Sequence, residues 1–182
     1  MTDNSLIVLH NLDAFPLVGG QILWRNPLEL QERPSLPTSD DEFMERFALT
    51  LVPPHQDNVT SGRRIAVGAE YYGGFGAAAN RGAGRVVNAG EWQVKGVGPT
   101  PLATAKSGFL HSYGALTACE AAYETVYTRL AEKILPFRAA AIAGIITLYS
   151  AASRAWRRLM ASSGAAMALA ASLLLRSPAP AS

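Results

Sequence analysis

The sequence has a single cysteine, Cys119, among its 182 residues. One cysteine cannot form an intramolecular disulfide or a cysteine-rich zinc site, and this scarcity is typical of a cytoplasmic protein. The three histidines, His10, His55 and His111, lack the spacing of metal ligands. Residues 1–17 lack the basic region of a secretory signal. We therefore expect a cytoplasmic protein without a metal site built from cysteine or histidine.

Acidic residues are missing from the C-terminal part of the chain. Residues 1–132 hold all 14 Asp and Glu together with ten Lys and Arg, whereas residues 133–182 hold six basic residues and no acid. These basic residues are sparse and lie among alanine and leucine, unlike the clustered basic patches with aromatic residues that bind nucleic acid. The composition therefore argues against a nucleic-acid partner.

The C-terminal segment 149–182 is rich in alanine, serine and arginine. Its residues Leu159–Leu175 form a run of 17 residues without a charge, which is at the lower limit for spanning a membrane. Three interpretations remain open: an alanine-rich helical tail packed on the domain, a segment translated out of frame, and a C-terminal membrane anchor. The abrupt loss of acids favours the second interpretation.

An N-terminal extension, residues 1–62, is broken by prolines and is expected to be irregular. Leu17–Trp24 is its one candidate strand. Ser39, followed by Asp40, Asp41 and Glu42, forms a capping box, and apolar residues then recur at helical spacing. This pattern predicts one short helix from Asp40 to Leu51, ended by the prolines that follow.

Three short β-like runs come next, at Arg64–Gly68, Arg85–Ala89 and Glu91–Lys95. Twelve of the 16 glycines lie between Gly62 and Gly114, and such density is typical of an antiparallel meander with tight connections. Because side chains alternate along a strand, the last run should place Trp92 and Val94 on the core face and Lys95 on the opposite face.

A long helix is predicted from Ala115 to Leu135. Its apolar residues recur every three or four positions, so we expect Cys119 to be buried and Tyr123 and Tyr127 to pack; the stripe comprises Leu116, Cys119, Tyr123, Val126, Leu130 and Ile134. Glu120 and Glu124 lie one turn apart and repel each other, which favours a cation beside them.

Ala139–Leu148 follows this helix and consists almost entirely of apolar residues. It is either a fully buried strand or a short helix, because periodicity does not separate the two.

The glycine-rich stretch before Lys95 is the part of the chain that suggests chemistry. It has neither a G-x-x-x-x-G-K-[ST] signature nor a G-x-G-x-x-G spacing, so a plain β-meander also explains it. However, a glycine-rich loop, a lysine on a following strand and a helix with a glutamate occur in the order of the nucleotide-binding lobe of kinase-like folds. This order favours a nucleotide phosphate site.

Residues 66–142 resemble the selenoprotein O family, pseudokinase-fold enzymes that adenylylate proteins from ATP. The resemblance rests first on a tyrosine-glycine stretch and a glycine-x-glycine-arginine turn. A lysine-glycine-x-glycine motif that ends in threonine-proline follows. The last element is a helix glutamate, after which the family has an isoleucine-proline pair. These correspond to Tyr71–Gly76, Gly82–Arg85, Val94–Pro101, Glu124 and Leu135–Pro136. The family's arginines after the threonine-proline pair are not matched, except by Lys106.

The resemblance implies an α+β fold in which residues 63–148 are an incomplete kinase-like lobe: a small antiparallel sheet with one long helix. It also implies ATP as cofactor, with Mg²⁺ in a complete homologue, and a protein as substrate. By the resemblance, Lys95 contacts the phosphates and Glu124 pairs with it; the other nucleotide-binding residues are Gly73, Gly74, Gly76, Gly82, Gly84 and Arg85.

No aspartate follows Asp57. The metal-binding and catalytic aspartates of kinase-like folds lie C-terminal to the nucleotide lobe, so we expect this chain to bind ATP without transferring its nucleotidyl group. The alternative function is a non-catalytic interaction module, tethered to a membrane through residues 159–175.

Overall fold

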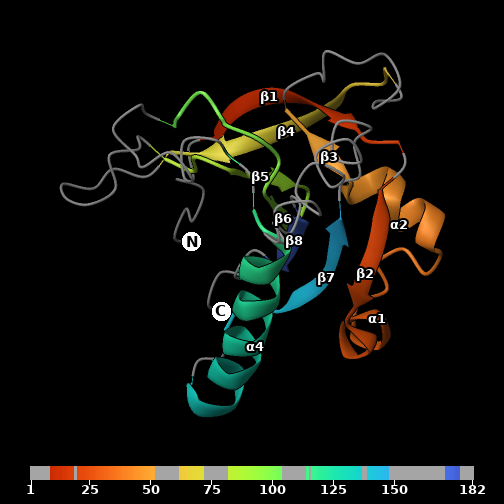
Figure 1. Cartoon of the computed structure of the whole chain (residues 1–182), viewed down its shortest axis with the longest axis vertical. Helices are drawn as coiled ribbons and strands as arrows, with labels where there is room; N and C mark the ends of the chain where they lie inside the picture. Colours follow the sequence, from red (N-terminus) through yellow and green to blue (C-terminus); the bar gives the residue numbers. More distant parts are fainter. Residues whose placement is uncertain are drawn as a thin grey trace, which may run out of the picture.

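The computed structural model describes residues 9–18, 20–51, 62–71, 82–103, 114, 116–136, 139–147 and 171–176, the last of these by backbone only. They form one eight-stranded sheet, in which every strand pairing is antiparallel, together with three helices (Figure 1). The predicted α+β class is therefore confirmed.

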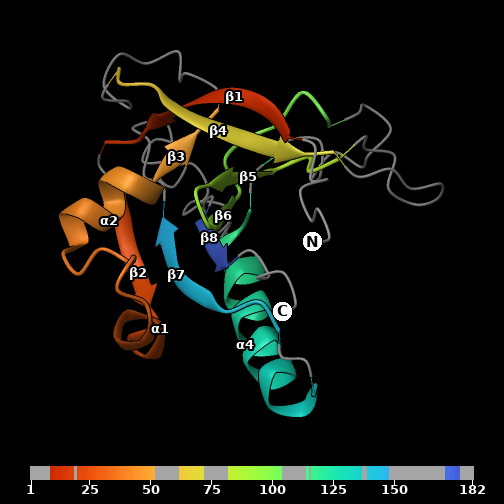
Figure 2. The same ribbon diagram turned by 180° about the vertical axis from the view of Figure 1, so that it is seen from behind.

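The strands follow the order β2-β7-β8-β6-β5-β4-β1-β3 across the sheet. Figures 1 and 2 show that the sheet curls, because β1, β3 and β4 are turned strongly relative to β2 and β7. The bounds are β1 Leu9–Pro16, β2 Gln21–Arg25, α1 Pro27–Glu32, α2 Asp40–Phe47, β3 Leu49–Thr50, β4 Ile65–Glu70, β5 Val86–Ala89, β6 Trp92–Lys95, α4 Ala118–Ile134, β7 Ile142–Thr147 and β8 Ala171–Arg176.

The main core lies between α2 and one face of the sheet. Trp92 and Val94 of β6 are fully buried there, as the alternation predicts. Phe47 of α2 packs edge-on against Trp92, with ring centroids 6.4 Å apart, and Phe43 packs against Phe47 at 5.1 Å. These aromatic contacts fix α2 on the sheet.

Helix α2 begins where the sequence predicts. The Ser39 hydroxyl accepts a hydrogen bond from the Glu42 backbone N–H at 3.2 Å, which caps the helix. The helix ends at Phe47, four residues before the predicted Leu51, because Leu49 and Thr50 pair with β1 as strand β3.

The N-terminal extension is more regular than expected. Strand β1 pairs with β4 from Leu9↔Glu70 to Ala14↔Ile65, so it belongs to the sheet. The strand predicted at Leu17–Trp24 is confirmed from Gln21 onward, where β2 lies, but not before it, because β1 ends at Pro16 and β2 begins only at Gln21. At Gly20, between them, an added Cβ would lie 3.0 Å from the Thr147 carbonyl oxygen, so a larger residue would crowd the backbone of β7.

Strands β7 and β8 bring the C-terminal part of the chain into the same sheet. All six residues of β7, Ile142–Thr147, are buried, so this part of the stretch predicted as a strand or a short helix is a strand. β8 lies between β6 and β7, with Lys95↔Leu173 on one side and Ile145↔Leu173 on the other. Residues 171–176 are thus a strand where a helical tail was expected; residues 149–170 and 177–182 lie outside the described residues.

The sheet therefore joins strands from all three segments that the sequence distinguishes, residues 1–62, 63–148 and 149–182. In the part of the chain that the structure describes, no helix is both long enough and apolar enough to cross a bilayer.

Helix α4 packs on the other face of the sheet. It starts three residues after the predicted Ala115, with Thr117 as N-cap in a reciprocal capping box with Glu120. Its contact with the sheet is made by Ala118 and Ala121, which pack with Ile142 and Ile145 of β7 and with Trp24. Small side chains allow the helix to approach β7 closely.

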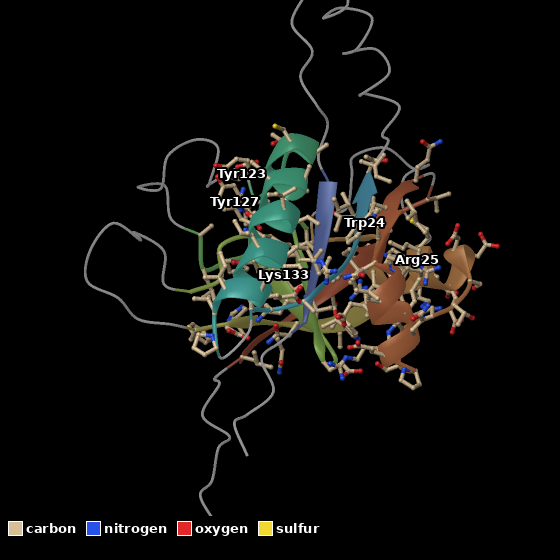
Figure 3. The ribbon with its side chains drawn as sticks, turned by 90° about the horizontal axis from the view of Figure 1, so that it is seen from below. Trp24, Arg25, Tyr123, Tyr127 and Lys133 are labelled. Carbon is tan, nitrogen blue, oxygen red and sulfur yellow. The ribbon has the colours of Figure 1, made fainter. Side chains whose placement is uncertain are left out.

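The predicted burial of the apolar stripe on α4 is wrong for most of its length. Leu116 is buried, but Cys119 is exposed and the exposed fractions reach 61% at Tyr123, 65% at Val126 and 68% at Ile134. Tyr123 and Tyr127 contact each other, with hydroxyls 2.8 Å apart, on the side of α4 away from Trp24 (Figure 3). The stripe points outward because the opposite side of the helix faces β7.

We expect a chain ended after Ala170 to lose its cooperative unfolding transition. This change removes β8, which exchanges backbone hydrogen bonds with both β6 and β7, and so leaves two unpaired strand edges in the middle of the sheet. Urea unfolding followed by tryptophan fluorescence measures the effect. A chain ended after Ser177 keeps β8 and is the matched control; equal stability of the two chains would contradict the central position of β8.

Candidate nucleotide-binding site

The candidate site lies on the face of β4, β5 and β6 that is opposite to the main core. The period of two directs Asn88 of β5, Gln93 and Lys95 of β6 and Glu70 of β4 to this side, where all four are half-buried. The register places Val86 opposite Lys95 and Asn88 opposite Gln93. We call this surface, Glu70, Val86, Asn88, Gln93 and Lys95, the polar face.

Lys95 and Glu124 form an ion pair between β6 and α4. The Lys95 ammonium donates to Glu124 Oε1, and the two side chains are 18% and 30% exposed. The pair forms because Lys95 points away from the core and Glu124 lies on a side of α4 adjacent to the sheet. The structure thus brings together the two residues that the family resemblance pairs.

A second ion pair joins the same two parts of the molecule. Arg85, which immediately precedes β5, has its guanidinium 3.8 Å from Glu120 Oε1. The Arg85 carbonyl accepts from the Gly96 N–H at 2.8 Å, so Arg85 and Lys95 lie at neighbouring positions of adjacent strands. A cation therefore lies beside each glutamate: Arg85 beside Glu120 and Lys95 beside Glu124.

Glu120 has a lowered pKa. The largest cause is the hydrogen bond that its carboxylate accepts from the Thr117 backbone N–H, which favours the charged form. Partial burial raises the pKa, while the Thr117 hydroxyl and the charges of Arg85 and Lys95 lower it further. One carboxylate oxygen serves the helix cap and the other faces Arg85.

The glycine-containing turns beside Arg85 and Lys95 pack against each other. The Thr100 hydroxyl donates to the Ala83 carbonyl at 2.6 Å, and the Thr100 N–H donates to the Gly84 carbonyl at 3.0 Å. Gly98, with φ +102°, takes a left-handed conformation that favours glycine. Gly82–Arg85 and Val94–Pro101, two of the segments that carry the family resemblance, are therefore in contact.

All five predicted phosphate-binding glycines lie in the connection between β4 and β5. Tyr71 and Gly82 form a β-bridge at its base, and a Cβ on Gly82 would collide with the Glu70 carbonyl, so this position requires glycine. Gly73, Gly74 and Gly76 lie outside the described residues. The described residues at the two ends of this connection, Tyr71 and Gly82, lie beside the polar face.

Sequence reasoning did not single out Glu70, Asn88 and Gln93 as a group. Glu70 Oε1 accepts from Asn88 Nδ2 at 2.8 Å and from Gln93 Nε2 at 3.0 Å. The alternation on β6 places Gln93 beside Lys95, but no local pattern connects Glu70 with either residue. The group was missed because it joins three strands.

The donors of the site suit an anion with several oxygens. The Lys95 ammonium has three N–H donors and uses one on Glu124, so it can donate to further acceptors while its position is held. Within the described residues, no three His, Cys, Asp or Glu side chains are grouped so as to hold a metal ion. Lys95 and Arg85 supply the cationic donors of the site, and such donors can bind an oxyanion.

No protein-family model, curated protein or solved structure matches this chain.

We expect Glu120→Gln to reduce the pH dependence of stability. A carboxyl whose pKa is lowered by folding stabilises the native state above its unfolded pKa, here 4.5, and this stabilisation is lost as the pH falls through the lower folded value. The free energy of unfolding should therefore fall less in the variant than in the wild type between pH 6 and pH 3. Glutamine can still complete the capping box, so the helix start is kept.

Urea unfolding at a series of pH values measures this difference. Glu91→Gln, at an exposed turn position, is the matched control. Parallel stability profiles for the wild type and Glu120→Gln would show that Glu120 is not linked to folding in this way.

Proposed function

We propose that the chain is the ATP-binding lobe of a selenoprotein-O-like adenylyltransferase. The observation that carries the proposal is the Lys95–Glu124 ion pair between a strand and a helix. In kinase-like folds the corresponding pair orients the lysine on the nucleotide phosphates and must be in place for activity. ATP supplies the adenylyl group when it is bound in a complete homologue.

The order of the elements supports the same function. The glycine-containing hairpin β4–β5 comes first, the lysine strand β6 is its neighbour, and α4 with its glutamate follows in the chain. In protein kinases a glycine-rich loop covers the phosphates, and the lysine lies on the third strand. This agreement extends beyond a single motif, because it involves the sheet neighbours as well as the sequence order.

The proposed roles follow from the donor set. Lys95 and Arg85 bind phosphate oxygens, Glu124 orients Lys95, and Glu120 stands beside Arg85. By the family resemblance, Gly73, Gly74 and Gly76 would bind the phosphates through their backbone; of this connection the structure describes the base, where Gly82 pairs with Tyr71. We propose binding without nucleotidyl transfer, since the sequence has no aspartate after Asp57 to position Mg²⁺.

A non-catalytic interaction module is the second candidate, and the exposed apolar stripe of α4 favours it. Apolar side chains gathered on one exposed helix face are typical of a surface that binds another protein. The membrane-tethered form of this candidate requires residues 159–175, of which residues 171–175 lie in β8 between two other strands. The stripe therefore supports a protein partner rather than a membrane.

We expect Lys95→Met to weaken ATP binding by about 10- to 100-fold. A hydrogen bond to a charged group contributes roughly 1.5–3 kcal/mol, and every 1.4 kcal/mol corresponds to a tenfold change in the dissociation constant. Isothermal titration calorimetry of the full chain with ATP measures this change. Lys133→Met removes an exposed lysine at the far end of α4 and should leave ATP binding unchanged.

Urea unfolding of both variants provides the control for folding. If Lys95→Met and Lys133→Met bind ATP equally well, Lys95 does not contact the phosphates and the nucleotide site is wrongly placed.

A further inference from the structure

Among the residues that the structure describes, the carboxylate of Glu70 on the polar face has no cation paired with it. Its Oε1 accepts two hydrogen bonds, from Asn88 and Gln93, while Oε2 makes no hydrogen bond to any residue that the structure describes. The two amides hold the carboxylate in place and leave one of its oxygens available. A fixed acceptor of this kind suits a ligand with hydroxyl donors.

Glu70 and Lys95 lie at the same end of the polar face. Gly68, Asn88 and Gln93 form one row across β4, β5 and β6, and Glu70 and Lys95 are each two residues beyond this row in the same direction. Adjacent strands are about 4.8 Å apart, so the backbones of the two residues are roughly 10 Å apart. An extended nucleoside triphosphate can bridge such a separation between its outer phosphates and its ribose.

At this end of the polar face, the β4 side and the β6 side differ in charge. Lys95, with Arg85 nearby, is cationic and suits phosphate, whereas Glu70 carries a carboxylate that accepts hydrogen bonds from hydroxyl groups. A carboxylate at a distance from the phosphate-binding groups is also how dinucleotide-binding sites hold the ribose, by accepting a hydrogen bond from its hydroxyl. The charge pattern therefore orients a nucleotide with its phosphates at β6 and its sugar at β4.

We propose that Glu70 binds the ribose hydroxyls of the nucleotide and makes the site select a nucleoside triphosphate over bare polyphosphate. This inference rests on the proposed function, because it assumes that phosphates bind at Lys95. It adds to that function a residue that determines specificity, together with the supporting residues Asn88 and Gln93.

Glu70→Gln tests this inference by calorimetry with ATP, 2′,3′-dideoxy-ATP and inorganic tripolyphosphate. Glutamine retains an oxygen for Asn88 and Gln93 but replaces the second acceptor with a donor. We expect the variant to bind ATP about tenfold more weakly and to bind tripolyphosphate and dideoxy-ATP as the wild type does. Unchanged tripolyphosphate binding also shows that the Lys95 end of the site is folded.

The wild type provides a measurement that does not depend on the stability of the variant. It should bind ATP about tenfold more tightly than dideoxy-ATP. Equal affinities in the wild type, no effect of Glu70→Gln on ATP, or an equal loss for all three ligands would each overturn the role of Glu70. If the wild type bound neither ATP nor tripolyphosphate, the proposed function itself would fail.

Discussion

The alternation of side chains along β6 is the constraint on which the rest of the structure depends. Within four residues this strand buries an indole and a valine on one face and presents an amide and an ammonium on the other. The apolar face requires a layer of aromatic residues, which α2 provides, and the charged face requires a carboxylate, which α4 provides. The two helices therefore lie on opposite faces of the sheet for different physical reasons.

On the charged face of the sheet, the basic side chains are balanced by carboxylates. Two cations on adjacent strands face two carboxylates on successive turns of α4, so the repulsion between Glu120 and Glu124 is offset by Arg85 and Lys95. A partly buried lysine without a carboxylate would carry a desolvation cost. The ion pairs consequently hold α4 against the strands at one end, while Ala118 and Ala121 hold it against β7.

The local patterns in the sequence correctly predicted the features that depend only on neighbouring residues. The Ser39 cap located the start of α2, and the period of two separated Trp92 from Lys95. They failed where the outcome depends on distant partners. The amphipathic pattern of α4 suggested that its stripe of large apolar residues faces the sheet. The side with Ala118 and Ala121 does so instead, because these small residues fit against β7. Glu120 and Glu124 pair there with Arg85 and Lys95. Glu70 gave no signal, since its partners Asn88 and Gln93 come from two other strands.

β8 was not predicted either, because three consecutive leucines after an alanine-rich stretch show no alternation, and its neighbour β6 is far away in the sequence.

The position of β8 at the end of the chain affects how the protein folds during synthesis. The ribosome synthesises β8 after all the other strands of the sheet. β6 and β7 therefore leave the exit tunnel with edges that have no partner yet. Until the last strand arrives, the nascent chain exposes two hydrogen-bonding edges beside apolar surface, a state that is prone to aggregation and that chaperones bind. The lysine strand is thus completed last, although it is made in the middle of translation.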